Sequence, residues 1–185
     1  AFELKKINTV LEIGAGSGRT SEVLLTINDK LKYIICDIPP AIYIAYKRLK
    51  IAFPNKKIKL LIDIEESEEL KRQIIENDIT FIFPHHLEFF KKNFIDLTVA
   101  IDCFHEMDKK TIKFFFEKIN NITNNLYFSI WEKTKVPYSK KILGKANILS
   151  FENGDYPIPS NWKNSFKENL IFPANQIGLG FKIDN

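Results

Sequence analysis

Three glycines stand close together near the start of the chain, in the segment LEIGAGSGRT. Gly14, Gly16 and Gly18 follow an apolar run that predicts a buried strand and precede a segment with helical spacing. Glycine at such a junction lets the backbone turn sharply and lets a ligand approach the N–H groups of the helix N-terminus. The spacing fits neither a dinucleotide loop, whose third glycine would fall at Arg19, nor a P-loop, which needs Gly-Lys-Ser/Thr. A glycine turn without a ligand is the alternative.

One acidic residue ends the next apolar run, in YIICDIPP. Asp37 stands about 20 residues beyond the glycines, where a carboxylate accepts hydrogen bonds from both hydroxyls of a ribose. Ile38 would then pack near the ribose or the base. A solvated loop aspartate is the alternative.

Three groups suited to proton chemistry follow a later apolar run, in AIDCFHEM. His105 is the candidate general base, because histidine titrates nearest to neutral pH, and Glu106 or Asp102 would orient it or bind an acceptor hydroxyl. The alternative is that Glu106 and Asp108 cap the next helix while His105 only packs. This mixture of ligand types permits a divalent cation, but no spacing requires one, so we expect no metal site.

Apolar runs alternate with amphipathic segments around these residues. The expected strands cover residues 8–14, 32–38, 57–63, 79–84, 95–101 and 126–131, with late strands at 170–172 and 180–183. Helices are expected over residues 20–32 and 42–53, and after the N-cap residues Ser67 and Asp108. Strands alternating with helices of about 10–15 residues predict βαβ units and a mainly parallel α/β sheet.

Composition limits the partners of this chain of 185 residues, which carries a net charge of +4. Only three of its 27 basic residues are arginines, and acidic residues are interleaved with the lysines, so we expect no nucleic-acid interface. No apolar run approaches the roughly 18 residues of a membrane span.

Cys36 and Cys103 lie inside apolar runs, which favours free thiols in a cytoplasmic protein. We expect a single domain, residues 1–185. Because the chain starts at Ala1 and its only methionine is Met107, we also expect that an N-terminal segment is missing.

Glu12 stands two residues before the first glycine, and the resulting pattern E-x-G-x-G-x-G resembles the first motif of class I S-adenosylmethionine (SAM) methyltransferases. The resemblance implies a Rossmann-like fold with a mostly parallel seven-stranded sheet and helices on both faces. It also implies that the loop holds the amino-acid end of SAM, that Asp37 binds the ribose, and that residues in FIFPHHLEFF lie beside the adenine. The implied cofactor-binding residues are Glu12, Gly14, Ala15, Gly16, Gly18, Arg19, Asp37, Ile38, His86 and Leu87. Asp63 is a rival to His86, and Arg19 either pairs with the SAM carboxylate or is a surface charge.

Three segments carry a closer resemblance: EIGAGSGR, DIPPAIYIAYKRL with FP following, and FIDLTVAIDCFHEM. Together they are similar to a sugar O-methyltransferase family found in bacterial surface-polysaccharide gene sets, over Val10 to Trp131. The chain departs from that family at Asp102-Cys103, where an Asn-Ser-like stretch is expected. We also expect that the N-terminal helices that usually cover the acceptor site in that family are missing here.

This closer resemblance implies that a sugar hydroxyl is methylated and that S-adenosylhomocysteine (SAH) is the product. Trp131 and Glu132 are then candidates for the acceptor side. A lipid or other small-molecule acceptor, and a non-catalytic SAM-binding scaffold, are the alternatives. The glycine spacing disfavours a nicotinamide-dependent oxidoreductase.

Overall fold

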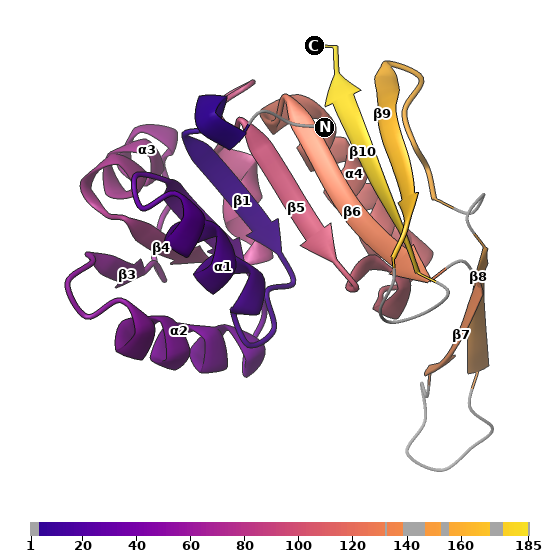
Figure 1. Ribbon diagram of the computed structural model, residues 1–185, viewed down its shortest axis with the longest axis horizontal. Helices are drawn as coiled ribbons and strands as arrows, with labels where there is room; N and C mark the ends of the chain where they lie inside the picture. Colours follow the sequence, from indigo (N-terminus) through magenta and orange to yellow (C-terminus); the bar gives the residue numbers. More distant parts are fainter. Residues whose placement is uncertain (1–3, 132, 139–146, 153–155, 171–175, 185) are drawn as a thin grey trace.

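The computed structural model describes residues 4–131, 133–138, 147–152, 156–170 and 176–184. An eight-stranded sheet runs through the molecule in the order β3-β4-β2-β1-β5-β6-β10-β9 (Figure 1). Its strands are β1 Thr9–Ile13, β2 Lys32–Cys36, β3 Ile58–Leu60, β4 Ile79–Ile82, β5 Leu97–Ile101, β6 Asn125–Trp131, β9 Trp162–Asn169 and β10 Gln176–Ile183.

The sheet is mostly parallel, as the sequence predicts. The strands from β3 across to β6 pair in parallel, whereas β10 is antiparallel to both β6 and β9. The sheet has eight strands, whereas the resemblance implied seven. The three-residue β3, which lies within the strand expected at 57–63, forms the edge beyond β4, and β9 at the opposite edge was not predicted from the sequence. Two further strands, β7 Lys133–Tyr138 and β8 Asn147–Glu152, form a separate antiparallel pair. The expected strand at 170–172 lies mostly outside the described residues, and that at 180–183 falls within β10.

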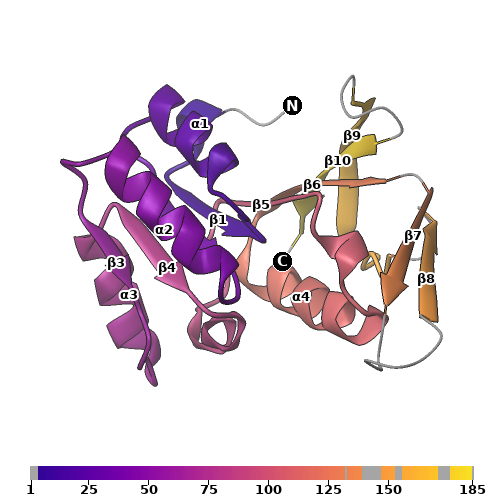
Figure 2. The same ribbon diagram turned by 90° about the horizontal axis from the view of Figure 1, so that it is seen from below.

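Helices cover both faces of the sheet. Helices α1 Arg19–Ile27 and α2 Ala41–Ala52 lie on one face and α4 Lys109–Ile122 on the other, as Figure 2 shows. Helix α3 Ser67–Glu76 packs into the same apolar cluster as α4. Three short 3-10 helices complete the described elements: η1 Leu4–Lys6, η2 Pro84–Phe89 and η3 Phe104–Glu106. No helix in the described ranges is both long and apolar enough to span a membrane.

Side chains of the central strands alternate between two apolar clusters, because successive residues of a strand point to opposite faces. On β1, Val10 packs under α1 and α2, whereas Leu11 and Ile13 pack under α3 and α4. With both faces covered, these strands read as continuous apolar runs, which is how the sequence revealed them.

The two predicted helix N-caps have different outcomes. Asp108 caps α4, and its side chain accepts the Thr111 N–H at 2.7 Å. Ser67 is not an N-cap: Glu66 precedes α3 without a side-chain cap, and Ser67 is the first helical residue.

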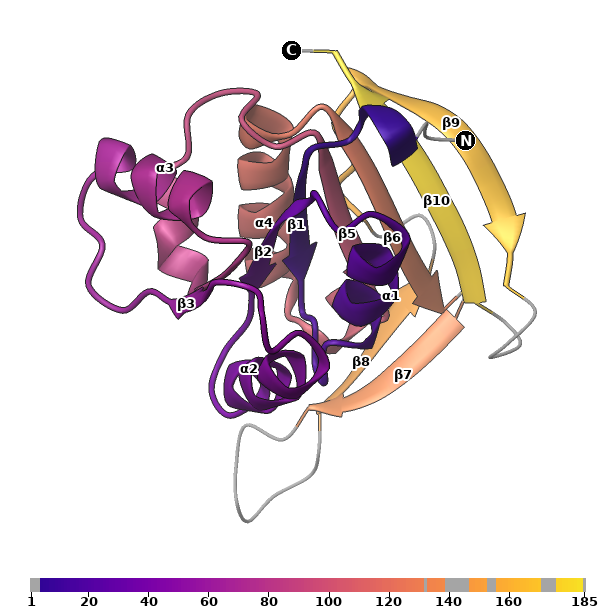
Figure 3. The ribbon, with the colours of Figure 1, turned by 60° about the vertical axis from the view of Figure 1, so that its left-hand side comes forward.

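Parallel strands bring their carboxyl ends to one edge of the sheet, and the arrowheads of β1 and β5 point the same way in Figure 1. The glycine loop follows β1, Asp37 follows β2, and η3 follows β5 at this edge. Strand β7 of the separate pair contacts η3, and Figure 3 shows the pair beside the end of β6. The topology therefore brings the segments that carry the predicted site residues together at the carboxyl edge of the sheet.

Candidate functional site at the carboxyl edge of the sheet

The glycine loop requires glycine for two different reasons. Gly14, Gly16 and Gly18 all have left-handed backbone angles, with φ of 69°, 55° and 76°. A Cβ on Gly14 would lie 2.6 Å from the Cβ of Cys103, so the loop packs directly on the residue after β5. A Cβ on Gly16 would meet nothing within 4 Å, so at this point the loop faces open space. The open side of the loop is therefore at Gly16.

Asp37 ties the glycine loop to the end of β2. The side chain is 9% exposed, and its two oxygens accept the N–H groups of Gly16 at 2.9 Å and of Ile38 at 2.8 Å. Each carboxylate oxygen has a second lone pair, so these bonds leave acceptor capacity for a diol. Asp37 thus has a structural function in the loop, and ribose binding by it stays a prediction.

Glu12 supports the loop from inside the protein. It is 2% exposed, and one carboxylate oxygen accepts the hydroxyls of Ser21 and, at 2.9 Å, of Tyr33. Burial raises the pKa of Glu12. These contacts join β1, α1 and β2 beneath the loop. No sequence pattern singled out Ser21 or Tyr33, because each lies inside an ordinary helix or strand.

The first turn of α1 presents Arg19 to solvent. Arg19 is exposed, and its Nε donates to Ser17 Oγ at 3.2 Å. The N-cap of α1 is Gly18, which provides no side-chain hydrogen bond to the first turn. This end of the helix suits a carboxylate. Ala15, also predicted to bind the cofactor, is partly buried against the α1 and α2 cluster.

The two residues predicted beside the adenine are buried. His86 is fully buried: its Nδ1 accepts the Phe83 N–H at 3.1 Å, and its Nε2 lies 3.1 Å from the Ile62 carbonyl oxygen. These partners assign the proton to Nε2 and use both ring nitrogens. Burial, with a contribution from the neighbouring His85, lowers the pKa of His86. Leu87 is 1% exposed and packs in the core, so side-chain contact of either residue with adenine has no support in this arrangement.

Other side chains near this end of β4 are accessible. His85 is exposed and stacks on Phe83, with ring centroids 5.9 Å apart and planes inclined by 13°. Ile38, which the sequence predicts near the ribose, is 61% exposed, and Asp63 is also exposed. The segment FIFPHHLEFF, which the resemblance places beside the adenine, thus contains one exposed ring, His85, which was not among the predicted cofactor-binding residues.

Asp102 and His105 meet just after β5. Asp102 has a left-handed φ of 56°, and its Oδ1 lies 3.5 Å from His105 Nε2. His105 is 6% exposed, and its Nδ1 has no hydrogen-bond partner among the described residues. Glu106, on the same turn, is exposed. Gln176, which the sequence did not indicate, donates from Nε2 to Asp102 Oδ1 at 2.7 Å. The side chains of Trp131 and Glu132 lie outside the described residues.

Negative charge is concentrated around Cys103. Burial raises the pKa of this thiol, and the carboxylates of Asp37, Glu106, Glu12 and Asp102 raise it further. Cys103 is therefore a poor nucleophile, and both cysteines are free and buried, as the sequence predicts. A cationic ligand fits this edge of the sheet electrostatically. Within the described ranges, no three His, Cys, Asp or Glu side chains are grouped to hold a metal ion.

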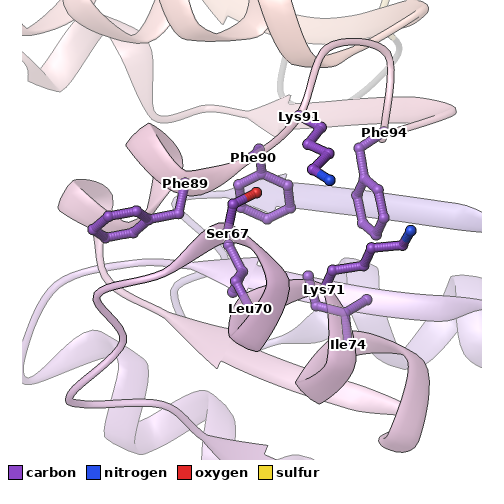
Figure 4. Close-up of a pocket in the computed structure, with 8 residues that line it drawn as sticks. All are labelled: Ser67, Leu70, Lys71, Ile74, Phe89, Phe90, Lys91 and Phe94. Atoms are coloured by element: carbon purple, nitrogen blue, oxygen red, sulfur yellow. The ribbon is translucent and has the colours of Figure 1, made fainter.

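A small pocket lies elsewhere, between α3 and the chain that leaves η2 (Figure 4). The residues that line it are Ser67, Leu70, Lys71, Ile74, Phe89, Phe90, Lys91 and Phe94. None of them is a predicted site residue. The rings of Phe90 and Phe94 pack against each other there, with their centroids 5.7 Å apart. This pocket is a gap beside the core rather than part of the site.

No family model matches the chain, and no curated protein matches it. Solved structures do. The chain superposes on the PH0226 protein from Pyrococcus horikoshii OT3 with a TM-score of 0.67 and 11% identity, covering 98% of this chain and 84% of that protein. It superposes on the mitomycin 7-O-methyltransferase MmcR with a TM-score of 0.60 and 12% identity, covering 100% of this chain and 51% of that protein.

An O-methyltransferase family protein from Burkholderia thailandensis gives a TM-score of 0.61 at 11% identity, covering 98% of this chain and 52% of that protein. The chain thus spans about half the length of these two O-methyltransferases. These similarities show the fold: the chain has the α/β fold of SAM-dependent methyltransferases, as the sequence predicts.

Proposed function

We propose that this chain is a SAM-dependent O-methyltransferase. The observation that carries the proposal is the buried His105 beside Asp102, at the same edge of the sheet as the glycine loop and Asp37. The imidazole lies next to a carboxylate, and its Nδ1 is buried without a hydrogen-bond partner among the described residues. It can take the proton of an acceptor hydroxyl once acceptor binding opens this side of the ring.

The residues at this edge fit SAM. The carboxylates around Cys103 match its positive charge, Gly16 presents open backbone, and Asp37 retains acceptor capacity for a ribose diol. The uncapped first turn of α1, with Arg19 on it, suits the amino-acid carboxylate. When bound, SAM supplies a methyl group on a positively charged sulfur.

His105 and Asp102 divide the remaining chemistry between them. The Asp102 carboxylate faces Nε2 and favours the tautomer with its proton there, which leaves the Nδ1 lone pair to take the proton of the acceptor hydroxyl. The 3.5 Å separation is long for a hydrogen bond, as is common before a substrate closes a site. Glu106 binds a second acceptor hydroxyl. Most of the rate enhancement then comes from holding the oxygen in line with the methyl group.

The acceptor in this proposal is a sugar hydroxyl, in the assembly of a surface polysaccharide. Its support is the sequence resemblance in the DIPP and HEM segments. The two buried free cysteines favour a cytoplasmic location. Another small-molecule hydroxyl is the second candidate, which the likeness to a mitomycin 7-O-methyltransferase favours.

Calorimetry with SAM and SAH tests the cofactor assignment. We expect both to bind, and we expect Asp37→Ala to weaken SAH binding by about 10-fold or more, the equivalent of one charged hydrogen bond. Asp29→Ala, an exposed turn residue, is the matched control and should bind as the unmodified chain does. Absence of binding, or equal binding by the Asp37 variant, would exclude the cofactor site.

The acceptor is tested by SAH release with a panel of sugars and phenols. Turnover on a sugar that is lost in His105→Gln supports the full proposal. Turnover confined to phenols would overturn the sugar assignment alone. SAH binding without turnover on any acceptor would favour a scaffold.

A further inference from the structure

We propose that Gln176 is a positioning residue, which holds the Asp102 carboxylate so that His105 keeps its proton on Nε2 and its lone pair on Nδ1. This inference rests on the proposed function, in which the Nδ1 lone pair of His105 takes the proton of the acceptor hydroxyl. It also makes a statement about the imidazole that is testable without cofactor or acceptor.

Backbone contacts hold the main chain of Asp102 in place. Its N–H donates to the Ser129 carbonyl oxygen at 3.1 Å and approaches Ser129 Oγ at 3.2 Å. Its φ of 56° is uncommon for a residue with a side chain, and short polar residues adopt it most readily. These contacts set the direction in which the Cβ leaves the backbone.

The Asp102 side chain needs a further restraint, because it is 44% exposed and water competes for its oxygens. Gln176 provides one: its Nε2 donates to Oδ1 at 2.7 Å. Gln176 is itself only 3% exposed. Gln176 is the first residue of β10, and its backbone pairs with Trp131 of β6. The sheet therefore fixes the backbone that carries the donor. A buried amide on a strand is a more rigid donor than a surface side chain.

The same oxygen, Oδ1, also lies 3.5 Å from His105 Nε2. A carboxylate oxygen has two lone pairs, so Oδ1 can accept from the Gln176 amide and from the imidazole at the same time. An ionised carboxylate can only accept a hydrogen bond, so it stabilises the tautomer that carries hydrogen on Nε2. Loss of the amide removes a restraint on Oδ1, and we expect the tautomeric preference of His105 to weaken.

Long-range proton–nitrogen NMR of the apo chain tests this inference at alkaline pH, where imidazoles are neutral. The chain has only three histidines, His85, His86 and His105, and a His105→Gln spectrum assigns the third signal. We expect His105 to be mainly the Nε2–H tautomer in the unmodified chain. In Gln176→Met, which keeps the length and loses the donor, we expect a mixture of the two tautomers. His86, whose tautomer is fixed by Phe83 and Ile62, is an internal control that should not change.

Two further variants make the test independent of one substitution. Asp102→Gly suits the left-handed backbone and removes the carboxylate, and we expect it to give the same mixture. Lys182→Met, exposed on the same strand, is the matched control and should leave His105 unchanged. If loss of the His86 signals shows that Gln176→Met is unfolded, Gln176→Thr takes its place, since threonine suits a strand and is too short to reach Asp102.

An Nδ1–H tautomer in the unmodified chain, or an unchanged His105 in a folded Gln176 variant, would overturn the proposal. These results are separable from failure of the proposed function, which SAH calorimetry measures. A tautomer shift without SAH binding would support the positioning by Gln176 and refute the cofactor site.

Discussion

Alanine substitutions at Gly14 and at Gly16 distinguish the cost of backbone strain in the glycine loop from the cost of a collision with a new Cβ. Both residues have a left-handed φ, so alanine at either is strained by about 1–2 kcal/mol. Only at Gly14 does the new Cβ collide, at 2.6 Å from the Cβ of Cys103, whereas the Cβ at Gly16 meets nothing within 4 Å. Both atoms of the collision are attached directly to backbone, so neither can swing away.

The expected losses of unfolding free energy follow from these distances. Gly16→Ala should lose only the strain, about 1–2 kcal/mol. Gly14→Ala should lose a further ~1–3 kcal/mol through overpacking. Cys103→Gly removes the partner atom, so a double-mutant cycle between Gly14→Ala and Cys103→Gly should recover a coupling free energy of about 1–3 kcal/mol.

Urea unfolding of the two single variants, of Cys103→Gly and of the double variant provides the four corners of the cycle. Calorimetry with SAH is run on Gly16→Ala, which should fold but bind more weakly, because its methyl group projects into the open space over the loop. Equal destabilisation by the two alanines, or a coupling near zero, would refute the proposed collision. Unchanged SAH affinity in Gly16→Ala would refute the assignment of the open side of the loop to the ligand.

Two further predictions concern single side chains. Burial raises the pKa of Glu12 above its ordinary value of 4.5, so the native state binds its proton more tightly, and the stability this confers is present below pH 4.5 and lost as pH rises through the native pKa. Glu12→Gln should therefore gain in unfolding free energy relative to the unmodified chain between acid and neutral pH, and a difference independent of pH in urea unfolding would contradict this. Asp108→Ala removes the α4 cap to Thr111 and should cost about 0.5–2 kcal/mol, while Asp108→Asn, measured by the same unfolding, should cost much less.

Much of the architecture was predictable from the sequence because strands with both faces covered are continuous apolar runs. The turn chemistry of Gly14 to Gly18 marked the first strand-to-helix junction, and Asp37 marked the end of the next strand. The N-cap at Asp108 was predictable for the same reason, because its partner Thr111 is only three residues along the chain. The edge strand Ile58–Leu60 lies within the strand expected at 57–63. The strand β9 was not predictable in this way, since its residues are mostly exposed and it becomes a strand by pairing with β10.

Sequence alone therefore determined the types of residue that gather at the carboxyl edge of the sheet, because strand, turn and helix signals depend on neighbours along the chain. Only the tertiary structure decided which of them are free to act. His86 is withdrawn into the core with both ring nitrogens bonded, whereas His105 keeps one nitrogen without a partner among the described residues. Gln176 reaches Asp102 across 74 residues because β10 returns antiparallel beside β6, which itself pairs with β5. A contact made by such a return of the chain has no local signal, so it was visible only in the folded protein.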